Sequence, residues 1–143
     1  MGSNFRFLSL SALIALGTAS AAVSASAADL SLEVTGHQPA GGKLRAALFA
    51  DSASFLEAPL KTVEVAASDV SIVVFRDLQV GTYAVTVYQD NNSNNRLDRG
   101  LFNIPTEPYG FSRDARGDGG PPKFRDAQIE LREPSAKFTV KLR

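Results

Sequence analysis

The sequence predicts an all-β fold, an antiparallel seven-stranded β-sandwich with one long ordered loop. Apolar and polar residues alternate over short runs, which is typical of strands with one buried face. Turn-forming Gly, Pro, Asn and Asp residues separate these runs, and no helical period persists for three turns. Short strands at this spacing favour two packed sheets over a closed barrel.

The first predicted strand shows the alternation best, with Leu30, Leu32 and Val34 on one face. Leu44, Ala46 and Leu48 face inward in the second in the same way. The third and fourth are separated by three residues, a spacing that suits a hairpin. The seven predicted strands are 30–35, 43–50, 62–66, 70–75, 83–89, 124–131 and 136–142.

The fifth predicted strand is introduced by the pattern Leu-x-x-Gly-x-Tyr at 78–83. This lead-in resembles that of prealbumin-like and carboxypeptidase-regulatory-like sandwiches, and it implies an Ig-like or prealbumin-like arrangement of the two sheets. Tyr83, Val85 and Val87 are expected to point into the core, because they share one face of a period-2 strand.

The connection that follows, 90–122, is long for a compact domain, where loops beyond about 12–15 residues are usually functional or disordered. It is too apolar for disorder. We expect it to lack regular secondary structure, to be ordered, and to fold back so that its apolar side chains are buried. These side chains are Leu97, Leu101, Phe102, Ile104, Tyr109 and Phe111.

The start of this loop has the spacing of a calcium loop. Counted from Asp90, alternate residues occupy positions 1, 3, 5, 7 and 9 of an EF-hand-type loop, where side-chain oxygens and one backbone carbonyl surround a hard cation. The predicted metal ligands are Asp90, Asn92, Asn94, Arg96, Asp98 and, from further along, Glu107.

The match to a calcium loop departs from the pattern at three points. Position 6 is Asn95 rather than Gly, which is tolerable because Asn enters the left-handed region readily. Position 12 is Leu101, so Glu107 must supply the missing acid after the chain folds back, and the flanks are not helices. Calcium is favoured over magnesium, with an affinity near about 10⁻⁴–10⁻³ M. The alternative is an Asx-rich turn that binds no ion.

The first 27 residues have the pattern of an export signal. Arg6 is followed by an apolar run over 7–17 and by small residues ending in an Ala-x-Ala site at 25–27. The apolar run is shorter than the roughly 20 residues of a membrane span. We therefore expect a single domain over 28–143, in the periplasm or secreted, without a membrane span.

Composition excludes several classes of function. The chain has 15 basic and 15 acidic residues and no cysteine, so it offers no basic stripe for nucleic acid, no disulfide and no thiol nucleophile. A single histidine, His37, lies in a turn. We expect an exported, non-enzymatic binding or accessory module with a metal ion as its partner. The alternative is a carboxylate- or metal-dependent hydrolase acting on envelope or extracellular substrates.

Several strings together resemble the bacterial family called domain of unknown function 2141. They lie at 81–85, 90–98, 104–112 and 120–124 and cover nearly all of the expected mature chain. The resemblance implies an exported sandwich with a D-x-N-x-N-x-x-L-D loop, which maps onto Asp90, Asn92, Asn94, Leu97 and Asp98, and with a separate acid, which maps onto Glu107. Family members often have Gly where this chain has Ser93 and Asn95. The family carries no settled function.

Overall fold

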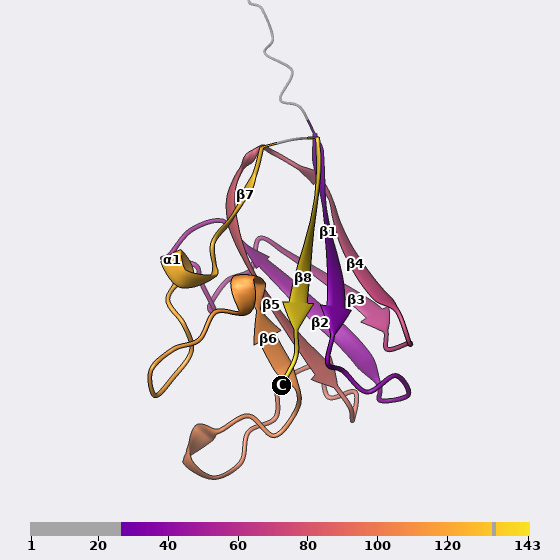
Figure 1. Ribbon diagram of the computed structural model, residues 1–143. Helices are drawn as coiled ribbons and strands as arrows, with labels where there is room; N and C mark the ends of the chain where they lie inside the picture. The colour runs from indigo at the N-terminus through magenta and orange to yellow at the C-terminus, as the bar shows by residue number, and fades with distance from the viewer. Residues whose placement is uncertain (1–26, 133) are drawn as a thin grey trace, which may run out of the picture.

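The computed structural model describes residues 27–132 and 134–143, so the predicted export signal lies almost wholly outside the described residues. The secondary structure is mostly β, in agreement with the prediction (Figure 1). Within the described part no helix is long and apolar enough to cross a membrane. The strands are β1 (Ala28–Thr35), β2 (Lys43–Phe49), β3 (Lys61–Ala66), β4 (Ser71–Leu78), β5 (Gly81–Asp90), β6 (Tyr109–Phe111), β7 (Ile129–Leu131) and β8 (Ser135–Lys141).

The strands form two sheets. One has the order β4-β1-β8 and the other the order β3-β2-β5-β6, with β7 also paired to β5. The predicted count of seven strands is therefore wrong, because the described chain has eight. The expectation of wholly antiparallel pairing is also wrong, since β1 and β8 run parallel.

The main core contains buried residues from both sheets, as the alternating patterns require. Leu30, Leu32 and Val34 of β1 are buried, and Leu44, Ala46 and Leu48 of β2 are fully buried. Tyr83, Val85 and Val87 of β5 join the same cluster, as do Phe75 and Val140. The inward faces assigned from the sequence are confirmed for β1, β2 and β5.

The expected hairpin between the third and fourth strands is wrong. β3 pairs with β2 in one sheet, and β4 pairs with β1 in the other. The segment 67–70 therefore carries the chain from one sheet to the other. Three residues suit a hairpin turn, but local spacing says nothing about which strand offers the better partner.

The predicted strand over 124–131 is also wrong in its first half, where the chain forms one helical turn, α1 (Phe124–Ala127). Asp126 stabilises this turn, because its carboxylate accepts the backbone N–H of Lys123 at 3.3 Å. Ala127 is completely buried in a second, smaller apolar cluster, against which Phe124 packs. Only 129–131 continues as a strand.

The long loop contains more regular structure than expected, because Tyr109–Phe111 forms β6 on the edge of β5. The last strand but one, β7, pairs with the same edge nearer the start of β5. Between the two, the Ser112 hydroxyl accepts the backbone N–H of Val85 at 2.9 Å and donates to the carbonyl of Ala127. Ser112 is fully buried, so water cannot reach this point, and its hydroxyl supplies the hydrogen-bond partner that the Val85 N–H and the Ala127 carbonyl would otherwise lack.

Replacing Ser112 by alanine is expected to lower the free energy of unfolding by about 1–3 kcal/mol, because the substitution leaves a buried N–H and a buried carbonyl unsatisfied. Urea unfolding of Ser112→Ala measures the loss. Ser52→Ala is the matched control, since Ser52 is exposed on the connection after β2. Equal midpoints for the two variants would show that the hydroxyl does not connect β5 to α1.

The expectation that the loop buries its apolar side chains is correct for Phe111 and wrong for the segment 101–104. Leu101 is 84% exposed, Phe102 is 92% exposed and Ile104 is 61% exposed. This segment forms a short 3-10 turn (η1, Leu101–Asn103) that projects beyond the ends of the sheets (Figure 1). The loop is organised around its polar groups, which leaves the apolar tip outside.

Candidate metal centre

The predicted site begins at the C-terminal end of β5, whose last two residues are polar and fully buried. Gln89 holds the turn between β1 and β2 in place. Its side-chain carbonyl accepts the Gln38 N–H at 2.9 Å, and its amide donates to the Gln38 carbonyl at 2.8 Å. Its backbone N–H donates to the carbonyl of Pro108 at 2.8 Å. The backbone is therefore held in place immediately before Asp90, where the loop begins.

The turn between β1 and β2 packs directly on the Asp90 backbone at Gly42. A side chain at this position would meet the Asp90 carbonyl oxygen at 2.1 Å, and Gly42 has a φ of +66°. Both facts require glycine here. The close approach fixes the direction in which the chain leaves β5.

The carboxylate of Asp90 organises the first turn of the loop. One of its oxygens accepts the N–H of Asn94 at 3.1 Å, and the other accepts the N–H of Asn95 at 2.9 Å. Asp90 has no exposed surface. A buried carboxylate that accepts two backbone N–H groups is well satisfied and fixes the following residues around itself.

Two Asx turns follow at alternate residues. The Asn92 side-chain oxygen accepts the N–H of Asn94 at 3.1 Å, and the Asn94 oxygen accepts the N–H of Arg96 at 3.0 Å. Between them, Ser93 and Asn95 have φ values of 62° and 65°. The left-handed conformation expected at Asn95 is confirmed.

The Asp98 carboxylate connects the end of the loop to the two Asx turns. Its two oxygens accept the side-chain amides of Asn92 at 2.6 Å and Asn94 at 2.7 Å. The Asn94 amide, then the Asn92 amide and the nearby Arg96 lower the pKa of the Asp98 carboxyl. Arg96 adds a longer contact, with its Nε 3.6 Å from Asp98.

Glu107 lies against the loop, as the fold-back from 98 to 107 requires. One carboxylate oxygen accepts the N–H of Asn91 at 2.8 Å, and the other accepts the N–H of Asp98 at 3.0 Å. The Thr106 N–H donates to the Asp98 carbonyl at 2.9 Å, which holds the returning chain in place. Glu107 is 7% exposed and therefore connects the start and the end of the loop from the inside.

The structure thus brings the five oxygen-bearing predicted ligands into one hydrogen-bonded loop. Arg96, predicted to contribute its backbone carbonyl, contributes its N–H to the Asn94 turn and its guanidinium to Asp98. Asn92 and Asn94 direct amide nitrogens at Asp98, while their oxygens accept the N–H groups of Asn94 and Arg96. A cation there would displace the amide nitrogens from Asp98 and use the second lone pairs of these oxygens. Each carboxylate oxygen keeps a second lone pair for a metal. Among the described residues, no group of three or more Asp, Glu, His or Cys side chains is close enough to hold a metal without other ligands. A cation here depends on the amide and backbone oxygens.

A histidine and serine pair that the sequence did not indicate lies away from this loop. His37 Nε2 is 3.2 Å from the Ser71 hydroxyl and 2.7 Å from the Ser68 carbonyl. A carbonyl can only accept, so Nε2 carries the proton and cannot act as a base toward Ser71. The buried Nδ1 has no hydrogen-bond partner in the described structure. This pair lacks the orientation of a nucleophilic site.

These features define an all-β protein of two sheets with an Asx-rich loop closed by a buried glutamate. The chain belongs to the family of uncharacterised proteins conserved in bacteria, domain of unknown function 2141, whose model matches residues 32–139. The chain matches no curated protein and no solved structure. The expected family is therefore confirmed.

The glycines expected in relatives at two loop positions have a physical explanation in this chain. Ser93 and Asn95 both adopt the left-handed conformation, which glycine enters at the lowest cost. Asn95 offsets part of that cost, because its side-chain oxygen accepts a hydrogen bond from Arg45 on β2. Serine and asparagine thus adopt here a backbone conformation that glycine would enter more easily.

Proposed function

We propose that this protein is an exported, non-enzymatic β-sandwich module that serves a binding or accessory role in the cell envelope, with its 90–98 loop organised by calcium. The observation that carries the proposal is the set of loop turns built on the Asp90 carboxylate and on the Asx turns of Asn92 and Asn94. Together with the Asp98 carboxylate, which accepts both Asn amides, and the Glu107 carboxylate, which accepts the N–H groups of Asn91 and Asp98, these contacts gather oxygen-bearing side chains in one loop. A hard cation prefers such a set of oxygens.

The proposed sandwich is Ig-like or prealbumin-like, with the two sheets as its layers. The core cluster draws its members from both sheets, which supports two packed layers. In such a fold the loops at the sheet ends are free to carry a site, while the strands hold them in place. The proposed calcium loop lies at one of these ends.

The proposed role of calcium follows from the charges in the loop. Asp90, Asp98 and Glu107 bring three carboxylates into one loop, and two amides and Arg96 offset the charge at Asp98. A divalent cation neutralises two negative charges and replaces the amide donors at Asp98, and the Asn92 and Asn94 oxygens can bind it through their second lone pairs while they keep their Asx turns. Calcium accepts such irregular sets of six to eight oxygens, whereas magnesium demands an octahedron.

Titration of the purified chain from residue 28 with calcium is expected to show one site of about 10⁻⁴–10⁻³ M affinity. Asp98→Asn removes a ligand charge that is partly open to solvent, and we expect it to weaken calcium binding about tenfold or more. Isothermal titration calorimetry and a calcium-dependent rise in melting temperature measure both effects.

Asp118→Asn is the matched control for this titration, because Asp118 is an exposed acid in the glycine-rich part of the same connection. It should bind calcium as the unmodified protein does. Absence of both heat and thermal shift in the unmodified protein would eliminate the calcium proposal. Loss of binding in both variants would assign the effect to net charge and not to the loop ligands.

A further inference from the structure

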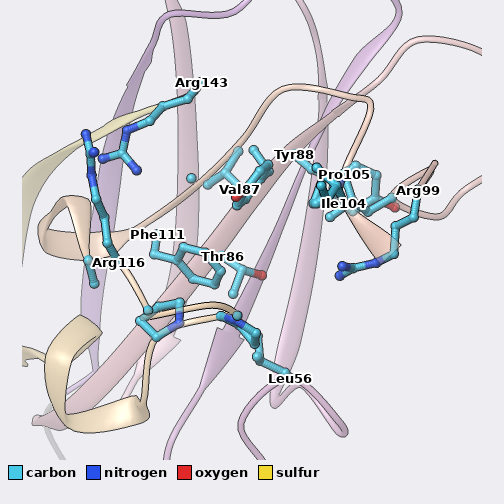
Figure 2. Close-up of a pocket in the computed structure, with 18 of the residues that line it drawn as sticks. Leu56, Thr86, Val87, Tyr88, Arg99, Ile104, Pro105, Phe111, Arg116 and Arg143 are labelled. Carbon is cyan, nitrogen blue, oxygen red and sulfur yellow. The ribbon is translucent and has the colours of Figure 1, made fainter. Parts of the chain in front are cut away.

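A large groove lies on the face of the five-stranded sheet that points away from the main core. It has a volume of about 810 Å³, which is in the range of pockets for small organic ligands. Its floor is formed by Ala47 of β2, Thr86 and Tyr88 of β5, and Phe111. Figure 2 shows Thr86 and Phe111 in the middle of the groove.

The walls come from segments far apart in the sequence. The loop from β5 contributes Leu97, Phe102, Ile104 and Pro105, and the segment after β2 contributes Leu56 and Pro59. The glycine- and proline-rich segment 117–122 completes the lining. Most of these side chains are apolar, so the groove favours a ligand with an apolar body.

Three arginines, Arg99, Arg116 and Arg143, line the groove, and its lining contains no acidic side chain. In the view of Figure 2, Arg116 and Arg143 stand at one end and Arg99 at the other. Arg99 donates to the Asn103 carbonyl and Arg143 donates to the Asp114 carbonyl, both of which are neutral.

These three arginines make no ion pair with a carboxylate in the described part of the chain, and outside the groove the same holds there only for Arg113. Five other arginines in the described chain pair with carboxylates. The five are Arg45, Arg76, Arg96, Arg125 and Arg132. The pair of guanidinium groups of Arg116 and Arg143 beside an apolar floor complements an anion, because guanidinium and carboxylate match in two-point geometry.

The exposed loop tip beside the groove supports the same conclusion. Phe102 has a φ of 59° and its ring is almost wholly in solvent, although it belongs to the groove lining. A bulky residue in the left-handed region is strained, and a solvent-exposed phenyl ring contributes no hydrophobic stabilisation. An apolar ligand that covers the ring would add hydrophobic stabilisation, which offsets the backbone strain and the exposure of the ring.

We propose that this groove binds a small amphiphilic carboxylate, whose hydrocarbon body lies on the floor between Thr86 and Phe111 and whose head group pairs with Arg116 and Arg143. The ligand class is a medium- or long-chain fatty acid. This proposal does not depend on calcium binding, because the groove is already formed when the 90–98 loop is held only by its own hydrogen bonds.

Binding of monomeric dodecanoate to the full chain from residue 28, in buffer with a chelator, tests this proposal. Tyr88 and Tyr109 line the groove, so tyrosine fluorescence should change on binding and isothermal titration should give the affinity. Dodecylammonium, with the same chain and the opposite charge, should bind about tenfold more weakly or not at all. Arg116→Gln with Arg143→Gln should weaken dodecanoate binding about tenfold or more.

Two further variants separate the groove from other surfaces. Arg76→Gln is the charge-matched control on β4 and should bind dodecanoate normally. Ala47→Phe fills the floor from a position outside the main core and should abolish binding while the melting temperature stays close to that of the parent protein.

Three outcomes would overturn the proposal. The first is equal affinity for both head-group charges, unaffected by the arginine substitutions. The second is flotation with phosphatidylglycerol vesicles without binding of monomeric dodecanoate, which would assign the surface to a bilayer. The third is a concentration-dependent dimer that Ala47→Phe abolishes, which would assign the groove to a second copy of the chain.

Discussion

Replacing Asp90 by alanine is expected to lower the free energy of unfolding by about 3–5 kcal/mol, the largest effect of any single change in the loop. The substitution removes the acceptor of two backbone N–H groups, those of Asn94 and Asn95. Hydrogen bonds to a charged group contribute about 1.5–3 kcal/mol each. Asp90 is fully buried, so water cannot easily replace its carboxylate.

Urea unfolding of Asp90→Ala in chelator measures this structural contribution alone. Asp69→Ala is the control, since Asp69 is an exposed acid in the segment between β3 and β4. A loss below about 1 kcal/mol would contradict the assigned hydrogen bonds. Repeating the experiment with free calcium at ten times its dissociation constant should widen the gap between parent and variant by about 1.4 kcal/mol.

The strands could be predicted because their signal is local. Alternation places Leu30, Leu32 and Val34 on one face whatever the rest of the chain does, and β1 follows it. The predicted strand over 124–131 failed for a long-range reason. Ala127 and Phe124 are recruited to the small cluster around Phe111, and that packing favours a helical turn over an extended run.

Sheet membership could not be predicted from local patterns. β6 and β7 share one edge of β5, and the buried Ser112 hydroxyl supports the strand where neither of them reaches. Nothing in the tripeptide Gly-Phe-Ser at 110–112 distinguishes this role from that of a surface serine. The spacing at 67–70 suits a hairpin, so it gave no indication that the chain passes from one sheet to the other there.

The loop geometry was predictable for a different reason, namely that Asx turns form between residues two apart. Asn92 and Asn94 form such turns, whereas the Asp90 carboxylate reaches further, to the N–H groups of residues 94 and 95. The groove was not predictable, because its arginines are 17 to 44 positions apart and meet only through the fold. Apolar side chains expected to be buried instead form one of its walls.

Replacing Glu107 by glutamine is expected to lower the free energy of unfolding by about 2–4 kcal/mol, although the side chain keeps its shape. Both carboxylate oxygens accept backbone N–H groups, from Asn91 and from Asp98. An amide must direct its NH₂ group at one of these donors, which loses one charge-assisted hydrogen bond and weakens the other. The side chain is too buried for water to relieve the conflict.

The loss in Glu107→Gln should be concentrated in the loop, and limited trypsin digestion detects this directly. Arg96 and Arg99 are exposed on the segment that Glu107 holds in place. Local opening should therefore speed cleavage after these two residues, with the strands left intact. Glu57→Gln is the control, because Glu57 is exposed on the connection after β2. If cleavage after Arg96 and Arg99 keeps the parent rate while global stability falls, Glu107 supports the sheets and not the loop, and its assignment to the metal centre is wrong.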